Sequence, residues 1–340
     1  MSSRTRTLML GLLVLLAVGV VAGTVRVPLV ALGPGPTFDV LGDVGGKTVV
    51  TINGRPTYPT TGRLNMTTVA VTDGLTAMNA LRFWADGDRE LMPRAVLYPP
   101  GKSDQQVEQE NNQLFTNSES DAEVAALTYL KEPVKVFVGQ LAPNAPAADV
   151  LKAGDQLVTV KNEQITSPEQ VSQILATTKP GDQIPVSYLR GDGPARTGTV
   201  TVGSHPSGPQ GFLGVVMRGE PEDPNQIMIS LGEVGGPSAG LAFALAVIDK
   251  LRPGDLLRGR AVAGTGEISP TGAVGPIGGI GLKMIAAKRD GATAFLVPAA
   301  NCAEAKSTAP DGLELIKVAT LSDAVGSLTA LNEGRAPAGC

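Results

Sequence analysis

The sequence predicts an α/β protein that also contains a β-rich unit and one apolar N-terminal helix. Downstream of residue 212, short apolar runs typical of strands alternate with segments of helical periodicity, as in a layered α/β domain. Residues 134–202 instead hold several short strand-like runs separated by turn sequences. Residues 7–25 are uncharged and long enough to cross a bilayer as a helix.

Composition limits the kinds of site that the chain can build. The 340 residues suggest two globular domains. The 28 basic and 32 acidic residues give a net charge of −4 with no Lys/Arg run longer than two, so we expect no nucleic-acid partner. One histidine, His205, and two cysteines cannot form a multi-histidine centre or a zinc cage, so we expect no metal site.

The N-terminal apolar stretch predicts where the chain is located. As a helix it would span close to the roughly 30 Å of bilayer hydrocarbon. Arg4 and Arg6 precede it and Arg26 follows, which places the N-terminus in the cytoplasm by the positive-inside rule. The alternative is a cleaved signal peptide, whose apolar core is usually about 7–15 residues. We predict a retained single-pass anchor within residues 1–30, in the cell membrane, with the later residues outside the cytoplasm.

Turns, short strands and one helix are expected between this anchor and residue 130. Gly33-Pro34-Gly35-Pro36 predicts a stiff, turn-rich exit from the membrane, and residues 101–112 a polar stretch. The expected elements are strands at 47–52 and 66–71 and a helix at 118–130.

Gly101-Lys102-Ser103 looks like the end of a phosphate-binding loop. That loop needs a glycine five positions before Gly101, and Val96 stands there. We therefore interpret the segment as a polar loop and expect no nucleotide or other cofactor.

Residues 131–203 are predicted to form a separate β-rich unit. Its expected strands are 134–141, 156–160, 184–189 and 197–202. Ser167 opens its helix as an N-cap, with Pro at the first position and Gln three residues on. Through this helix, Ala145-Pro146-Ala147 and Leu151-Lys152-Ala153-Gly154-Asp155, the unit resembles a PDZ domain of the kind attached to envelope proteases.

The PDZ resemblance implies peptide binding, because such domains add an extended segment or a C-terminus as a strand beside the helix. It implies that Val171, Ile174 and Leu175 flank the groove. No apolar-Gly-apolar loop precedes Val134, so we do not predict recognition of a terminal carboxylate in particular.

A Pro/Gly/Ser linker at 205–211 leads into the last part of the chain, where strands and helices alternate. The expected strands are 226–230, 261–268, 294–297 and 313–318, and the expected helices are 238–251, 281–289 and 321–331.

Ser238 is a candidate nucleophile. It precedes the apolar run 241–248, a helix that must be buried. Ser238 would lie at the first turn, where free backbone N–H groups and the positive end of the helix dipole favour an oxyanion. The alternative is an ordinary N-cap serine in a glycine turn.

A serine nucleophile needs a base. His205 lies in the linker with nothing nearby to orient it, and we interpret it as an ordinary loop histidine. Lys283 is flanked by apolar residues at the start of a helix, where desolvation would populate its neutral amine. The alternative is a surface lysine whose stem alone is buried.

Three segments in the same order as in a known family favour the catalytic interpretation of Ser238 and Lys283 over an N-cap serine and a surface lysine. Gly236-Pro237-Ser238-Ala239-Gly240, Thr265-Gly266-Glu267-Ile268 and the segment from Pro276 to Lys283 closely resemble the proteolytic domain of Lon proteases, which uses a Ser-Lys dyad. The resemblance implies that Ser238 is the nucleophile and Lys283 the general base. Where Lon proteases usually have a second lysine two residues earlier, this chain has Gly281.

The same resemblance assigns supporting residues. Thr265 matches the threonine that helps to hold the lysine amine. Backbone groups of Gly236, Pro237 and Ala239 are expected to form the oxyanion and substrate-binding site.

The complete chain resembles the membrane-anchored, PDZ-containing Lon-like serine proteases of bacteria. We expect the first part of a Lon-like domain at 44–130, the PDZ domain at 131–203 and the catalytic part at 206–335. The resemblance implies an ATP-independent, extracytoplasmic serine endopeptidase whose partners are protein or peptide substrates of the cell envelope, with homo-oligomer formation left open. The alternative is a catalytically silent scaffold or peptide-binding protein.

The two cysteines suggest one further feature. Disulfides persist outside the cytoplasm, and the tail before Cys340 is rich in Gly, Pro and Ala. We predict a bond between Cys302 and Cys340. Two free thiols, or an intermolecular bridge through Cys340, remain the alternatives.

Overall fold

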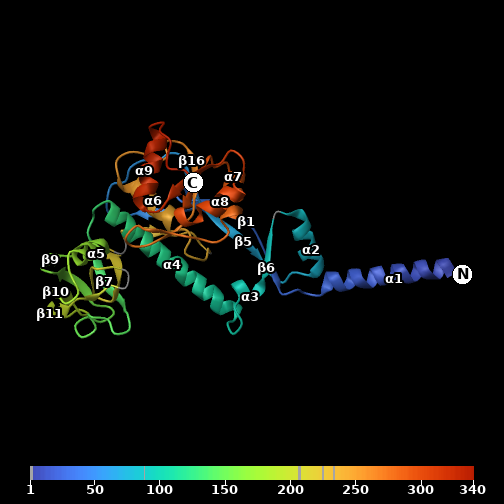
Figure 1. The fold of residues 1–340 in the computed structure, drawn as a ribbon. Coiled ribbons are helices and arrows are strands. Elements are labelled where there is room, and N and C mark those ends of the chain that lie inside the picture. Colours follow the sequence, from blue (N-terminus) through green and yellow to red (C-terminus); the bar gives the residue numbers. More distant parts are fainter. Residues whose placement is uncertain (1–2, 88, 206–207, 224–225, 233) are drawn as a thin grey trace.

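A computed structural model describes residues 3–87, 89–205, 208–223, 226–232 and 234–340 (Figure 1). The helices are α1 (Ser3–Thr24), α2 (Ala77–Asp86), α3 (Arg94–Leu97), α4 (Asp104–Tyr129), α5 (Pro168–Ala176), α6 (Gly240–Leu251), α7 (Ile280–Arg289), α8 (Cys302–Thr308) and α9 (Leu321–Asn332), with a 3₁₀ turn, η1, at Ala299–Asn301. The strands are β1 (Leu29–Asp39), β2 (Asp43–Val44), β3 (Lys47–Thr48), β4 (Val50–Ile52), β5 (Arg63–Thr72), β6 (Glu90–Pro93), β7 (Val134–Leu141), β8 (Gln156–Val160), β9 (Glu163–Gln164), β10 (Gln183–Leu189), β11 (Arg196–Thr201), β12 (Gly203–Ser204), β13 (Gly211–Phe212), β14 (Val215–Pro221), β15 (Ile227–Ile229), β16 (Ala261–Gly264), β17 (Glu267–Ile268), β18 (Val274–Gly275), β19 (Ala294–Pro298) and β20 (Glu314–Val318). The predicted α/β fold class is confirmed.

The larger domain is built on a sheet of strand order β20-β19-β16-β5-β1-β6. The first four strands of this order are parallel, and β1 and β6 complete the sheet with antiparallel pairings. Strand β5 comes from before the β-rich unit and β16 from after it, and they pair directly from Ala261↔Arg63 to Gly264↔Met66. Two separated parts of the sequence therefore build one domain.

Strand β1 replaces the turn that was expected at Gly33–Pro36. The prediction was wrong because prolines normally interrupt strands, whereas here the register with β5 shifts between Pro34 and Thr37. At Gly35 a Cβ atom would lie 2.4 Å from Thr68 Oγ1, so only glycine allows this close approach of β1 to β5.

The second sheet has the strand order β11-β10-β8-β7-β14. Strands β7 and β8 have the predicted bounds, and α5 begins after Ser167, whose hydroxyl accepts a hydrogen bond from Gln170 N. Strand β14 was not predicted. It pairs with β7 from Val215↔Leu141 to Pro221↔Val134, so this sheet extends beyond residue 203.

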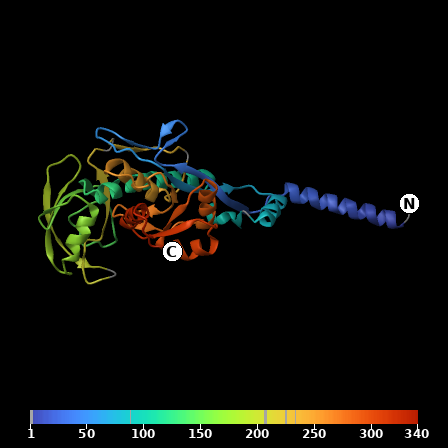
Figure 2. The same cartoon turned by 90° about the horizontal axis from the view of Figure 1, so that it is seen from above.

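Helix α4 connects the two sheets (Figures 1 and 2). It begins at Asp104 rather than at 118, because Ser103 and Gln106 form a capping box at its N-terminus. Toward its C-terminal end the helix packs against β14, where a Cβ atom at Gly219 would lie 2.4 Å from Val124 Cγ1. The polar composition of residues 101–112 concealed a helix with a largely exposed first half.

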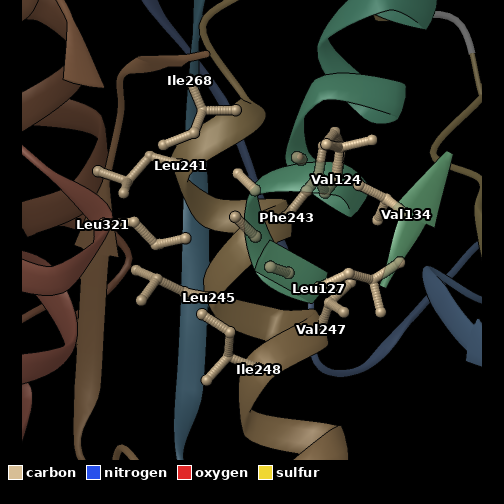
Figure 3. Close-up of a cluster of buried hydrophobic side chains, with 14 of the residues drawn as sticks. Val124, Leu127, Val134, Leu241, Phe243, Leu245, Val247, Ile248, Ile268 and Leu321 are labelled. Atoms are coloured by element: carbon tan, nitrogen blue, oxygen red, sulfur yellow. The ribbon is translucent and has the colours of Figure 1, made fainter. Parts of the chain in front are cut away.

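Helix α6 forms the centre of the core (Figure 3). Its side chains pack between α9 on one side, through Leu321, and α4 on the other, through Val124 and Leu127. The Phe243 ring meets Phe115 of α4 edge-on, with ring centroids 5.8 Å apart. The predicted apolar helix is therefore buried as expected, although it begins at Gly240 instead of at 238.

Helix α1 extends away from the domain (Figures 1 and 2). Residues Arg4–Thr24 form the one helix among the described residues that is long and apolar enough to be a candidate membrane span; a signal sequence would share these features. Helix α2 lies beside its C-terminal end and was not predicted.

Candidate active site

A cleft of about 470 Å³ contains both Ser238 and Lys283 in its lining. It lies near the carboxyl end of β16, which Thr265 follows, and beside the middle of β5, where Thr68 lines the cleft. The cleft therefore brings together residues that are distant in sequence, beside two internal strands of the larger sheet.

Ser238 lies two residues before α6, in a loop that α4 holds in place. Gly236 N donates a hydrogen bond of 3.0 Å to Asn111 O. Ser118 Oγ donates one of 2.9 Å to Pro237 O. Sequence analysis did not identify Asn111 or Ser118, because nothing local indicates that α4 lies against this loop.

Lys283 projects from the first turn of α7 toward Ser238. Its Nζ donates a 2.8 Å hydrogen bond to Ser238 Oγ. The lysine is only 4% exposed, and this burial lowers its pKa to about 8, while the charge of Glu267 acts in the opposite direction. An amine with this pKa is partly neutral near neutral pH, as a general base must be.

Thr265 completes a hydrogen-bonded triangle. Its backbone interrupts the single strand predicted over 261–268, dividing it into β16 and β17. The buried hydroxyl accepts a 3.0 Å hydrogen bond from Lys283 Nζ and donates one of 3.1 Å to Ser238 O. The structure thus brings all three predicted catalytic side chains together.

The predicted oxyanion residues need correction. Proline has no backbone N–H, so Pro237 cannot donate to an oxyanion. The N–H of Gly236 is already directed at Asn111 O. The N–H groups of Ser238 and Ala239, at the N-terminus of α6, are the better candidates. Gly236, Pro237 and Ala239 do line the cleft.

The cleft walls are mainly apolar. The apolar side chains among the lining residues are Pro36, Phe38, Met66, Val69, Val234, Pro237, Ala239 and Ile277. Glu267 is the acidic member of the lining. Within the described ranges, no three or more His, Cys, Asp or Glu side chains are arranged to hold a metal ion.

A second groove, of about 520 Å³, lies between α5 and the beginning of β14. Of the three residues predicted to flank it, only Leu175 lines it. Val171 and Ile174 are buried in the core. The expectation was wrong for these two because one side of the short helix α5 packs inward, while the adjacent side, with Ser172 and Leu175, faces the groove.

The apolar-Gly-apolar loop sought before Val134 is present elsewhere. Leu213-Gly214-Val215 leads into β14 and lines the groove opposite α5. It was missed because it follows the last predicted strand of the unit. His205 also lines this groove, with its ring 5.3 Å from the Phe212 ring, and takes no part in the Ser238 cleft.

A disulfide joins Cys302 at the start of α8 to Cys340 in the tail. The tail runs beside β20, where Lys317 N donates to Ala338 O at 2.8 Å and Cys340 N donates to Leu315 O at 3.3 Å. The cysteines lie outside the lining of the Ser238 cleft.

Two protein families match the chain. Residues 231–329 match the Lon protease (S16) C-terminal proteolytic domain, and residues 105–202 match the PDZ domain. The first match includes Ser238, Thr265 and Lys283. The second begins within α4 and covers α5, but ends before β14.

Curated relatives match only part of the chain. The Lon protease of Methylocella silvestris is 40% identical over 101 residues, which cover 30% of this chain and 12% of that protein. Lon protease 2 of Bacillus subtilis is 37% identical over 97 residues, covering 28% of this chain and 17% of its own length. The mitochondrial Lon protease homolog of Mus musculus is 42% identical over 83 residues, covering 24% of this chain and 8% of its own length.

The solved structures similar to this chain include the PDZ domain of an SdrC-like protein from Listeria monocytogenes. It is 23% identical, with a TM-score of 0.23, and the match covers 24% of this chain and 85% of that one. The family matches lead to one conclusion: residues 231–329 belong to a Lon protease C-terminal proteolytic domain and residues 105–202 to a PDZ domain.

Proposed function

We propose that this protein is an ATP-independent serine endopeptidase that acts outside the cytoplasm through a Ser238–Lys283 dyad. The observation that carries the proposal is the 2.8 Å hydrogen bond between Lys283 Nζ and Ser238 Oγ, in a cleft where burial lowers the lysine pKa to about 8. A nucleophile paired with a base of suitable pKa is what acyl transfer requires.

The geometry supports a two-step hydrolysis. Ser238 Oγ attacks the scissile carbonyl while the neutral Lys283 amine accepts the hydroxyl proton. The N–H groups of Ser238 and Ala239 stabilise the oxyanion, and the lysine then gives its proton to the leaving amine. Water, deprotonated by the same lysine, attacks the acyl-enzyme, and the proton returns to Ser238 as the ester bond breaks. Thr265 keeps the amine directed at the serine.

Peptide capture is assigned to the groove between α5 and β14. An extended peptide adds a strand along β14, which is an edge of its sheet. The loop Leu213-Gly214-Val215 lies where backbone N–H groups could receive a terminal carboxylate. The substrates would then be proteins or peptides of the cell envelope, and the chain requires no cofactor for this reaction.

The location is part of the proposal. Helix α1 is taken as a retained single-pass membrane anchor with the catalytic domain outside the cytoplasm, supported by the apolar span Arg4–Thr24 and by the charges that flank it. ATP independence is supported by the lack of a phosphate-binding loop sequence around Gly101.

The dyad is tested with Ser238→Ala, Lys283→Ala and Lys283→Arg in the purified full-length protein, using unstructured peptide substrates. Each variant should lose at least about 10³-fold in kcat, and the double alanine variant should be no worse than either single one, because the two side chains act as a unit. Arginine fails because a guanidinium stays protonated near neutral pH.

Lys288→Arg is the matched control, since this α7 lysine donates to Gly312 O and lies outside the cleft lining. It should retain activity and the wild-type melting temperature. Turnover by Ser238→Ala would contradict the dyad. A wild-type protein that binds peptides but never reacts with serine-acylating probes would favour the silent scaffold instead.

A further inference from the structure

Helix α2 carries an apolar face that the domain covers only in part. Successive residues of a helix are offset by about 100°, so Phe83 and Ala80 lie on neighbouring sides. These two contribute to a small cluster beneath the helix, in which Ala80 is buried and Phe83 half-buried. The apolar face continues around the helix from Ala80 through Trp84 and Leu81 to Met78, and these last three side chains are left exposed by the residues that the structure describes.

The uncovered part is large and hydrophobic. Trp84 is 72% exposed, Leu81 59% and Met78 46%. The remaining sides of the helix are polar, with Arg82 paired to Asp86 at 3.5 Å. Helices divided in this way lie in membrane interfaces, with their apolar side among the acyl chains and their polar side in water.

The position of α2 indicates what covers this face. Backbone hydrogen bonds connect the start of α2 to the end of α1: Ala77 N donates to Val25 O at 3.3 Å, and Val27 N donates to Leu75 O at 2.8 Å. In Figure 1, α2 lies directly beside the C-terminal end of α1 and runs across its direction, with β6 on its other side. If α1 crosses a bilayer, α2 lies at the level where α1 leaves it.

We propose that α2 docks on the surface of the bilayer, inserting Met78, Leu81 and Trp84 into the leaflet from which α1 emerges. The inference rests on the membrane anchor of the proposed function. Trp84 suits this depth, because the indole ring is enriched at membrane interfaces. Docking adds a second attachment beside α1, and the catalytic domain then keeps one face toward the membrane instead of turning about a single helix.

Trp84 is the only tryptophan of the chain, so its fluorescence reports on this site alone. The full-length protein is reconstituted into phosphatidylcholine vesicles whose acyl chains carry bromine either near the headgroup or near the chain terminus. We expect blue-shifted emission, stronger quenching by the shallow bromines than by the deep ones, and protection from acrylamide in the water.

Leu81→Asp should reduce both the shallow quenching and the protection. Leu114→Asp is the matched control, because Leu114 is also a helical leucine, 44% exposed, but lies on α4. This control should leave both signals unchanged. Peptide hydrolysis by the same preparations confirms that each variant is folded.

The outcomes separate the inference from the anchor. Protein that floats with the vesicles while acrylamide quenches Trp84 freely keeps the anchor and overturns the docking. Protein that does not float overturns both. Trp84 that is protected from acrylamide but insensitive to bromine, in vesicles and in detergent alike, indicates a protein partner such as a second copy and also overturns the docking.

Discussion

Lys283 combines a buried position with a hydrogen bond to Ser238 Oγ, and both follow from its place in the first turn of α7. Burial lowers its pKa to about 8, so the fraction of neutral amine increases as the pH rises through that value. We therefore expect kcat/KM for peptide hydrolysis to rise with pH and to level off above about 8.

Glu267 provides a test of this assignment. Its negative charge raises the lysine pKa, so Glu267→Gln should move the midpoint of the pH profile to lower pH. Initial rates of wild type, Glu267→Gln and the distant control Glu333→Gln, measured across the pH range, check this expectation. A midpoint that moves upward in Glu267→Gln would contradict Lys283 as the titrating base.

In the proposed mechanism Thr265 is a positioning residue, because its hydroxyl contacts the lysine amine and the Ser238 carbonyl. Thr265→Val keeps the shape but leaves a buried hydrogen-bonding group unpaired, which costs about 1–3 kcal/mol. If this cost raises the activation free energy of the chemical step, kcat decreases by about 5- to 150-fold with KM nearly unchanged. Thr265→Ser should restore most of the rate. Steady-state kinetics of wild type, Thr265→Val and Thr265→Ser measure these changes. If the role of Thr265 were only structural, thermal melts would show that both variants lower the melting temperature equally.

The resemblance of three ordered motifs to the Lon proteolytic domain pointed to Ser238, Thr265 and Lys283, and hydrogen bonds of Lys283 Nζ to Ser238 Oγ and Thr265 Oγ1 bring the three side chains together. Ser118 and Asn111 lay beyond this kind of reasoning. Each contacts the loop before Ser238 across more than a hundred residues of sequence, and only the packing of α4 against α6 creates those contacts.

At the scale of elements, local periodicity predicted β7, β8 and α5 well, since each has one clearly apolar side or an N-cap signal, and an almost unbroken apolar run predicted α6. Strand β1 escaped prediction because its Gly-Pro pairs resemble a turn, and the first half of α4 escaped it because that half is polar, while the second half was predicted as a helix at 118–130. Tertiary partners decide the structure of β1, which β5 and β6 flank, whereas a local capping box starts α4, and the helix then packs against α6 and β14.

Helix α5 yields a prediction about the groove. Leu175→Asp should weaken binding of a peptide with an apolar C-terminal residue by about 10-fold or more, because a buried leucine contributes about 1.5–3 kcal/mol. The domain should stay folded. Val171→Asp should instead unfold the PDZ domain, because its side chain is fully buried. Anisotropy of a labelled peptide and thermal melts monitor both properties; equal melting behaviour of the two variants would contradict the assignment.

The disulfide of the C-terminal tail yields a prediction about stability. In the chain-entropy description, closing the 38-residue separation between Cys302 and Cys340 stabilises the fold by about 4 kcal/mol. The paired Cys302→Ser and Cys340→Ser substitution should therefore lower the melting temperature while leaving kcat/KM at ambient temperature nearly unchanged. Mass mapping of non-reduced, alkylated protein shows whether the bond is present; two alkylated cysteines in native material would contradict it.

For the whole molecule, the arrangement of one domain around another follows from strand pairing. Strands β5 and β16 pair directly, although the PDZ unit lies between them in the sequence. Contacts between residues far apart in the chain therefore hold the cleft together. Sequence patterns predict the order of the domain segments along the chain, but they do not predict which surfaces of those segments contact each other.

Helix α4 contacts elements of both sites. One end of the connection is Val124 against Gly219 of β14, and the other is Asn111 and Ser118 on the loop before Ser238. If a peptide in the groove changes the affinity of the cleft for a reversible peptide-aldehyde inhibitor by some factor, the inhibitor must change the affinity of the peptide by the same factor. We expect Ser118→Ala to bring both factors toward one together, as titrations of each ligand in the presence of the other would measure. If Ser118→Ala brings both factors toward one, α4 carries the coupling, and a wild-type factor above one means that an occupied active site holds a captured chain in the groove until cleavage is complete.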